Sequence, residues 1–587
     1  MIKKLAQYIK QYKKDSILTP IFVIFEVVME VLIPYLMARI IDVGIQNSDL
    51  NYIFKIGAIL VVSAILSLTF GMLSGRYAAK ASAGFAKNLR QGMFYNIQNY
   101  SFTNIDKFST SSLVTRLTTD VTNVQMAFQM IIRILVRAPI MLIFALTMAF
   151  SINSKLAWIF VVTMPILAVV LFYIAIKAHP YFEKVFKKYD SLNRVVGENL
   201  NAIRVVKAYN REEHEQNKFG NVNDEVYKLF KKAEKIVAFN SPAMQLTIYT
   251  CILLISWIGA KLIVGGSMQT GELSSIITYA WQILSSLMMI SFVFVMIIIA
   301  ESSAERIIEV LDEESTIRNK ENPVMKVKDG SITFDHVSFQ YDDAKAEDEL
   351  PLEDINIEIE SGETIGIIGA TGSSKSTIVN LIPRLYDVSE GAIKVGGIDV
   401  RDYDIETLRN EVAVVLQKNV LFSGTIKENL RWGNKEASDE ELVRVCKLAQ
   451  ADGFIQEFPD KYDTLLDQGG TNVSGGQKQR ICIARALLKK PKILILDDST
   501  SAVDTKTDAL IRKAFREEIP NTTKIIIAQR ITSVEDADRI IVLEDGKING
   551  IGTSEELLKT NAIYQEVYES QKKGEEDDGK EKSEEQE

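Results

Sequence analysis

A glycine-rich turn between two apolar segments has the composition of a phosphate-binding loop. The segment 364–368 is typical of a strand, and the segment 378–385 is typical of a helix. Backbone N–H groups and a helix N-terminus attract anions, while Lys375 can reach the terminal phosphates and Ser376 can offer a hydroxyl to Mg²⁺. The loop residues expected to hold the nucleotide are Gly369, Thr371, Gly372, Ser373, Ser374, Lys375, Ser376 and Thr377.

One position of this loop departs from the usual pattern. Ser374 stands immediately before the lysine, where the pattern has glycine. Glycine is favoured where the backbone needs a positive φ, so we expect the serine to strain the backbone or to crowd the phosphates. The strand and helix on either side argue against a chance match, and we predict a nucleotide site with an altered position.

Two further stretches suit the same chemistry. The apolar run 492–496 ends in Asp497, and an acid at the end of a buried strand can hold Mg²⁺ directly or through water. The turn formed by Ser474, Gly475, Gly476 and Gln477 opens an apolar helix, whose N-terminus can grip a second phosphate. The combination is more specific than a phosphate loop alone.

Length and composition indicate a membrane protein with several domains. The 587 residues are 47% hydrophobic and carry a formal net charge of −9, which gives no sign of nucleic-acid binding. The three cysteines are widely spaced, which argues against a disulfide framework or a zinc site. No cleavable signal peptide is expected, because the first apolar run is too long.

Six segments of the first half are long and apolar enough to cross a bilayer, which takes about 20 residues each. An even number of spans puts both termini on one side. The long connections are rich in Lys and Arg, so we expect them, both termini and the nucleotide domain to be cytoplasmic. The expected spans are 16–41, 53–78, 130–152, 156–177, 239–263 and 273–299.

The long connections are themselves helical in pattern, so we expect the membrane helices to extend into the cytoplasm. Two pieces, 110–116 and 198–207, would lie near the ends of these extensions, where a membrane domain must contact a soluble one. Residues 1–14 carry five lysines among apolar residues and resemble an interfacial amphipathic helix.

Four charged residues fall within the predicted spans. Glu26 and Glu30 are four apart on the first span, and Arg133 and Arg137 are four apart on the third. Charges inside a bilayer are costly, so we predict that they face the interior, where they pair with each other or line a polar cavity. The alternative is that both arginines only extend to the interface.

The domain boundaries follow from composition. Residues 1–312 form the predicted transmembrane domain, and the charged segment 313–330 is the linker. Residues 331–570 alternate short Val/Ile strands with helical patterns, which predicts an α/β nucleotide-binding domain. The tail 571–587 is almost entirely charged and is expected to be disordered.

The motifs of the second half carry a family resemblance. The phosphate loop, the strand ending in Asp497 and the turn at 473–477 are accompanied by an exporter-like segment at 421–430 and by Ser-Ala-Val-Asp at 501–504. With them the chain resembles the ABC transporter family, in particular bacterial multidrug-type exporters with one membrane domain and one nucleotide domain per chain. The resemblance implies a six-helix α-helical transmembrane domain with long cytoplasmic helical extensions, fused to an α/β P-loop ABC nucleotide-binding domain.

The resemblance also implies roles and cofactors. Tyr341 stands where an aromatic residue stacks on adenine, and Gln417 where a glutamine touches Mg²⁺ and senses the membrane domain. Asp504 belongs to the segment 501–504, which matches the family's D-loop and follows the strand that ends in Asp497. The implied cofactors are ATP and Mg²⁺, with Ser376, Gln417 and Asp497 around the metal. The implied location is the bacterial cytoplasmic membrane.

Departures from the family pattern bear on catalysis. Asp498 replaces the glutamate that polarises the attacking water, and Gln529 replaces the histidine that contacts the γ-phosphate. Gln468 replaces a glutamate that precedes the turn at 473–477, which matches the family's signature motif and is called the signature turn below. Such replacements are typical of the degenerate-site subunit of a heterodimeric ABC exporter, whose own site binds ATP and hydrolyses it poorly. The alternative is a homodimer with two slow sites.

The resulting functional prediction is ATP-driven export across the lipid bilayer, in partnership with a second half-transporter chain. A second hypothesis is an ATP-gated regulator that moves no substrate. Drug, lipid and peptide substrates all remain open, with small hydrophobic or amphiphilic compounds favoured by the resemblance. An apolar, aromatic-bearing stretch can line a hydrophobic cavity or face lipid; it includes Tyr279, Trp281, Met288, Met289 and Phe292.

Overall fold

The computed structural model describes residues 1–341, 350–370, 372–499 and 501–571. The chain divides into two compact units. The first comprises residues 1–98 and 110–313, and the second comprises residues 99–109 together with everything from 314 onward. The short segment 99–109 therefore belongs to the second unit although it lies between helices of the first.

The first unit is entirely helical. Six helical stretches are long and apolar enough to span a membrane, which confirms the predicted number of spans. They contain 36 to 53 residues, more than the roughly 20 that a bilayer requires. The α-helices of this unit are α1 (Ile2–Gln7), α2 (Lys13–Arg39), α3 (Leu50–Gln98), α5 (Thr110–Thr115), α6 (Val121–Ile152), α7 (Ser154–Asn201), α8 (Ile203–Ala208), α9 (Glu212–Val237), α10 (Asn240–Val264) and α11 (Thr270–Asp312).

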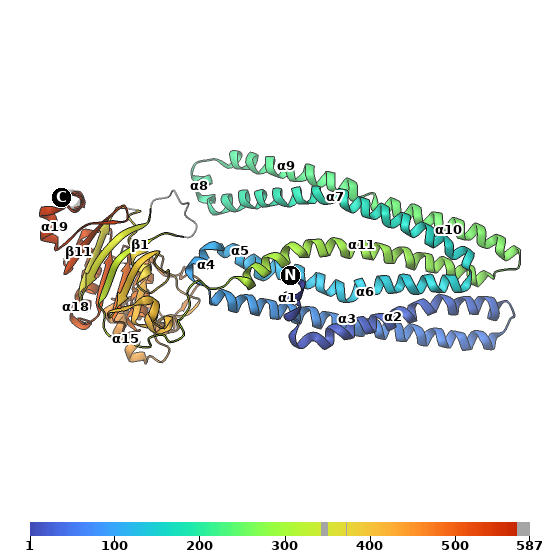
Figure 1. The fold of residues 1–587 in the computed structure, drawn as a ribbon, viewed down its shortest axis with the longest axis horizontal. Helices are drawn as coiled ribbons and strands as arrows, with labels where there is room; N and C mark the ends of the chain where they lie inside the picture. Colours follow the sequence, from blue (N-terminus) through green and yellow to red (C-terminus); the bar gives the residue numbers. More distant parts are fainter. Residues whose placement is uncertain (342–349, 371, 500, 572–587) are drawn as a thin grey trace. The chain divides into compact units, whose positions relative to one another are not determined.

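Close helix pairs organise this unit. Helix α2 runs beside α3, α6 beside α11, and α7 beside α9 and α10 (Figure 1). The start of α11 is tied to the π-helical turn after α2, Ile40–Ile45, by the buried Asp42, whose carboxylate accepts hydrogen bonds from the backbone N–H groups of Gly271 (2.6 Å) and Glu272 (2.9 Å). Glycine is needed at position 271, because a Cβ atom there would lie 2.6 Å from the Ala38 carbonyl oxygen.

The charged residues within the spans are paired. The Arg137 guanidinium forms an ion pair with Glu26 and another, 2.6 Å long, with Glu30. Glu26 also accepts a 3.2 Å hydrogen bond from the Ser74 hydroxyl. The predicted pairing is thus confirmed for Arg137. In the part of the chain that the structure describes, Arg133 has no ion-pair partner and lies against Gly75 of α3.

The second unit is an α/β structure with three sheets. A six-stranded sheet has the order β12-β11-β3-β10-β9-β6, a four-stranded antiparallel sheet has the order β2-β1-β4-β5, and β7 pairs with β8. The strands are β1 (Ile332–Phe339), β2 (Leu352–Ile359), β3 (Thr364–Gly369), β4 (Glu390–Val395), β5 (Ile398–Asp399), β6 (Val412–Val415), β7 (Gly424–Thr425), β8 (Leu465–Leu466), β9 (Ile493–Asp497), β10 (Thr523–Ile527), β11 (Arg539–Glu544) and β12 (Lys547–Gly552). The helices are α4 (Phe102–Lys107), α12 (Lys375–Leu381), α13 (Ile405–Glu411), α14 (Ile426–Leu430), α15 (Asp439–Leu448), α16 (Asp452–Glu457), α17 (Gly475–Leu487), α18 (Thr505–Glu518) and α19 (Ser554–Thr560).

The six-stranded sheet determines where the predicted site residues meet. Strands β6, β9, β10 and β3 are parallel neighbours, with Val415 beside Leu496 and Ile527 beside both Asp497 and Ile367. Their carboxyl ends therefore share one edge. Every residue of β9 and β10 is buried, as expected for Ile- and Leu-rich central parallel strands.

Helix α4 begins with a capping box and is held to the rest of the second unit by polar contacts. The Ser101 hydroxyl lies 2.7 Å from that of Thr316, and the Asn104 side-chain amide donates a 3.1 Å hydrogen bond to the Glu314 carbonyl. The segments 110–116 and 198–207, which we predicted near the ends of the membrane-helix extensions, belong to the first unit.

Candidate nucleotide site

The phosphate loop connects β3 to α12. Lys375 Nζ donates hydrogen bonds to the carbonyl oxygens of Gly369 (2.8 Å) and Ala370 (2.7 Å), and lies 3.3 Å from the Ser373 hydroxyl. Burial lowers the pKa of Lys375, while Asp497 and Asp498 act in the opposite direction. Thr371, one of the predicted contacts, lies outside the described residues.

Ser374 adopts the backbone conformation that the sequence pattern suggested. Its φ is +64°, in the left-handed region where a side chain is disfavoured. Gly372, two residues earlier, also has a positive φ of +92°. The expectation of backbone strain at position 374 is confirmed, and the chain tolerates it within the phosphate loop.

Two oxygen ligands expected for Mg²⁺ lie together. The Ser376 hydroxyl donates a 3.0 Å hydrogen bond to Asp497 Oδ1. Burial raises the pKa of Asp497, and the hydrogen bond from Ser376 opposes this rise. A hydroxyl and a carboxylate in contact are the hard oxygen donors that Mg²⁺ prefers in phosphate sites, so these residues fit the implied ion. When bound, the ion would neutralise charge on the phosphates.

The ends of three parallel strands converge on Asp498. Gln529, which follows β10, donates a 2.8 Å hydrogen bond to Asp498 Oδ2, and Gln417, which follows β6, donates one of 3.2 Å to the same oxygen. Asp498 itself follows β9, has a φ of +47° and is buried. The structure thus brings together three of the predicted site residues, Asp498, Gln529 and Gln417.

The predicted adenine platform is part of an aromatic cluster. The Tyr341 hydroxyl lies 3.1 Å from that of Thr377, and its ring makes edge contacts with Phe339 and Tyr386 at centroid distances of 4.7 and 5.3 Å. Tyr386 was not singled out from the sequence, because no motif spacing marks its position. The cluster joins Tyr341 to the phosphate loop through Thr377.

The signature turn lies at the start of α17. Ser474 and Gln477 form a capping box there, and a Cβ atom at Gly476 would lie 2.8 Å from the Ala502 carbonyl. The Ser501 hydroxyl donates a 3.0 Å hydrogen bond to the Asp498 carbonyl, and Asp504 caps α18. Within the described ranges no hydrogen bond joins Ser474, Gly475, Gly476 or Gln477 to the phosphate loop.

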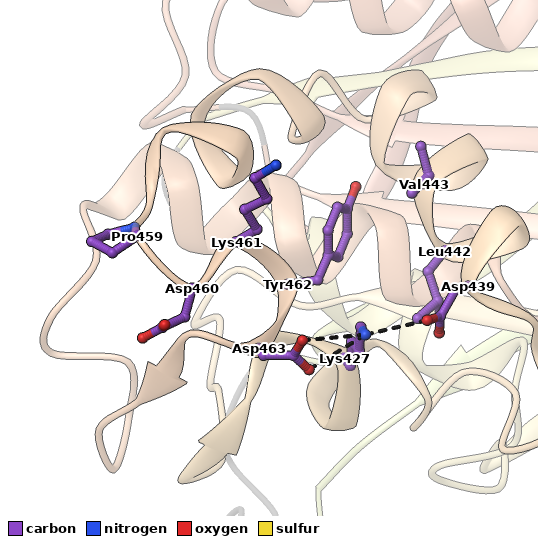
Figure 2. A pocket seen from close by; sticks show the side chains of 9 residues that line it. All are labelled: Lys427, Asp439, Leu442, Val443, Pro459, Asp460, Lys461, Tyr462 and Asp463. Atoms are coloured by element: carbon purple, nitrogen blue, oxygen red, sulfur yellow. Dashed lines mark hydrogen bonds and ion pairs between the residues drawn. The ribbon is translucent and has the colours of Figure 1, made fainter.

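A separate pocket of about 290 Å³ lies among α14, α15 and the segment 459–463 (Figure 2). Lys427 reaches Asp439 at 3.2 Å and Asp463 at 3.3 Å, so this ammonium group is already engaged by two carboxylates of the pocket. None of the predicted nucleotide residues lines it. We therefore place the chemistry at the strand ends and not in this pocket.

The strand-end cluster has the parts that phosphoryl transfer from a nucleotide requires. Lys375 and the loop backbone can bind phosphate oxygens, Ser376 and Asp497 can hold Mg²⁺, and Asp498 can orient a water molecule.

Comparison with known proteins agrees with this assignment. The family description "ABC transporter transmembrane region" matches residues 16–298, and "ABC transporter" matches residues 352–501.

Whole-length relatives decide the family. An uncharacterised ABC transporter ATP-binding protein of Bacillus subtilis, YfiB, is 40% identical over 570 residues, which is 97% of this chain and 98% of that protein. The chain is an ABC transporter. A second ABC transporter from the same organism, named as the probable multidrug resistance ATP-binding/permease protein YheI, is 31% identical over 97% of each chain.

The fold of this ABC transporter is that of an exporter half. A solved bacterial Atm1-family ABC exporter with ATP bound superimposes with a TM-score of 0.83 at 22% identity, covering 95% of this chain and 99% of that one. The predicted fold class and the predicted ATPase nucleotide domain are confirmed, as is the presence of one membrane domain and one nucleotide domain of the ABC transporter family in a single chain.

Proposed function

We propose that this ABC exporter is one half of a heterodimer, and that its own phosphate loop binds ATP with Mg²⁺ but hydrolyses it poorly. The proposal is carried by the surroundings of Asp498. Its Oδ2 atom accepts hydrogen bonds from two neutral amides, those of Gln529 and Gln417. This oxygen is committed to fixed donors at the position where a catalytic carboxylate must engage water.

The chemistry of these side chains supports slow hydrolysis. Aspartate is one methylene shorter than the glutamate expected here, and an error of about 1 Å in a catalytic group can cost on the order of a hundredfold in rate. The amide of Gln529 donates hydrogen bonds but carries no charge and relays no proton, unlike histidine. ATP binding, in contrast, depends on Lys375, the loop backbone and the metal ligands, and the contact between Ser376 and Asp497 supports this part of the proposal.

A partner chain with an intact site completes the proposal. The signature turn retains Ser474, Gly475, Gly476 and Gln477, and it would close the partner's nucleotide site. ATP held between two nucleotide domains favours their closed state, because only that state contacts ATP from both sides.

The substrate we propose is a small hydrophobic or amphiphilic compound. On α11, Trp281, Met288, Met289 and Phe292 expose 42–56% of their surface within this chain, so they are accessible for contact with a substrate, a partner or lipid. Tyr279 is fully buried, and its hydroxyl donates a 2.8 Å hydrogen bond to the Val31 carbonyl, which removes it from the candidate lining. The name of the relative YheI points to drug-like compounds.

The deciding experiment is ATPase activity in lipid nanodiscs, for this chain alone and co-expressed with a candidate half-transporter partner. We expect activity only with the partner, abolished by mutating the partner's catalytic glutamate and retained in Asp498→Ala of this chain. Full activity of this chain alone, lost in Asp498→Ala, would establish a homodimer with two working sites. ATPase activity without substrate flux in sealed vesicles would favour the ATP-gated regulator.

A further inference from the structure

Residues 528–531, which follow β10 and include Gln529, form a loop that we call the switch loop. The side chain of Gln571 holds this loop. The Gln571 side-chain amide donates a 2.7 Å hydrogen bond to the Gln529 carbonyl, and its Oε1 accepts a 2.8 Å hydrogen bond from the backbone N–H of Ile531. One side chain thus spans Arg530 and fixes the backbone on both sides of it.

The two contacts satisfy groups that the loop itself leaves open. Ile531 begins a short 3₁₀ turn, Ile531–Ser533, whose N-cap residue Arg530 makes no side-chain capping bond. The first N–H groups of a helical turn have no partner within the turn, so Gln571 supplies the missing acceptor. Ile531 itself is buried in the core.

Gln571 sits on a well-anchored segment. Residues 562–571 are helical, Tyr564 is fully buried, and Ile563, Val567 and Tyr568 pack against the same hydrophobic core as Ile531. Because this helical segment is packed against the core, the backbone of Gln571 is already ordered. Its side chain can therefore hold the loop in one position at a small further cost in conformational entropy.

We propose that Gln571 is a positioning residue that sets the switch loop so that the Gln529 side chain meets Asp498. The contact series runs from Gln571 through the Gln529 backbone to the Gln529 amide, and from there over 2.8 Å to Asp498 Oδ2. The inference rests on the proposed role of Gln529 and Asp498 beside the γ-phosphate. It adds a third residue, far away in sequence, that determines how the site senses that phosphate.

The test compares affinities for a non-hydrolysable ATP analogue and for ADP, measured on the full chain in nanodiscs by displacement of a fluorescent nucleotide. Only the analogue has a γ-phosphate. The affinity for the analogue divided by the affinity for ADP therefore reports on the switch loop and is independent of hydrolysis. We expect Gln571→Ala to lower this ratio about fivefold through loss of two hydrogen bonds, with ADP affinity unchanged. Gln571→Glu, which keeps an acceptor for Ile531 but no donor for Gln529, should lower it as well.

Gln565→Ala is the matched control. Gln565 lies on the same segment and donates a 2.6 Å hydrogen bond to the Leu558 carbonyl, away from the switch loop, so its removal should leave the ratio unchanged. An unchanged ratio in both Gln571 variants, with Gln529→Ala lowering it, would overturn the role of Gln571 alone. An unchanged ratio in Gln529→Ala would overturn the placement of Gln529 beside the γ-phosphate, and with it the positioning role of Gln571.

Discussion

The Tyr386 hydroxyl donates a 2.6 Å hydrogen bond to a carboxylate oxygen of Asp106, a residue of α4. The Phe102 ring of the same helix lies 5.8 Å from the Tyr386 ring, which in turn contacts Tyr341. Burial and the Asp106 carboxylate both raise the pKa of Tyr386, so the phenol stays a neutral donor at physiological pH. An aromatic series therefore joins α4 to the proposed adenine platform.

Removing this hydrogen bond should weaken the hold on α4. We expect Tyr386→Phe to lower the stability of the second unit by about 1 kcal/mol, the usual net worth of one hydrogen bond. Thermal unfolding in detergent measures the effect. In a double-mutant cycle Asp106→Asn should cost little more on the Tyr386→Phe background. Fully additive losses would show that the two side chains do not act together.

The ion pairs of Arg137 predict a strong asymmetry among substitutions. Arg137→Gln leaves Glu26 and Glu30 close together without a counter-charge, and breaking a buried ion pair costs roughly 3–5 kcal/mol. We expect little folded protein by size-exclusion chromatography, and recovery when Glu26→Gln and Glu30→Gln are added. Arg133→Gln, one turn away, serves as the control and should fold well. Equal damage from both arginine substitutions would contradict the pairing.

Glycine at position 374 should relieve the phosphate loop. A non-glycine residue in the left-handed region costs roughly 1 kcal/mol or more, so we expect Ser374→Gly to raise the unfolding temperature modestly and to tighten ATP binding. Ser48→Gly is a matched control, because Ser48 has a similar φ of +55° in a loop of the first unit. It should leave ATP affinity unchanged. Weaker ATP binding in Ser374→Gly would mean that the hydroxyl itself contributes.

Restoring the family residues should restore hydrolysis at this chain's own site. In a background where the partner's glutamate is mutated, we expect Asp498→Glu with Gln529→His to raise ATPase activity by up to roughly a hundredfold. Either change alone should recover less, because the carboxylate and the side chain at 529 are in contact. A double variant that stays inactive would place the defect elsewhere in the site.

The lowered pKa of Lys375 predicts how ATP binding depends on pH. The free lysine loses its proton below the ordinary value of 10.5 because it is buried. Bound phosphates favour the charged form, so ATP affinity should be constant near neutral pH and should fall as the pH rises through the lowered pKa. Fluorescent-nucleotide titrations between about pH 7 and pH 10 measure this. A flat profile across that range would contradict the burial effect.

The sequence was sufficient to predict those site residues that are marked by a motif or by a pattern of neighbouring residues. Lys375 and Asp497 lie near the ends of parallel strands, and apolar runs that end in a glycine-rich turn or an acid reveal such ends. Asp498 and Gln529 could be placed beside them through the resemblance of their segments to the family's motifs. The four-residue spacing of the intramembrane charges likewise indicated a shared face.

Tyr386 and Gln571 could not be predicted in this way. Tyr386 acts through ring contacts, and Gln571 binds backbone groups of a loop some 40 residues away. Neither kind of contact leaves a residue-type pattern. The membership of residues 99–109 in the second unit was also missed, because a helical pattern does not reveal against which core a helix packs.

That membership has a practical consequence for dissecting the protein. A fragment cut at residue 314 would carry every nucleotide motif but would lack α4, leaving Tyr386 without Asp106 and Thr316 without Ser101. Recombinant versions of the nucleotide domain should therefore be less soluble and less stable than the same residues in the intact chain. Adding a peptide of residues 99–109, or grafting it by a short linker, offers a way to restore the missing surface.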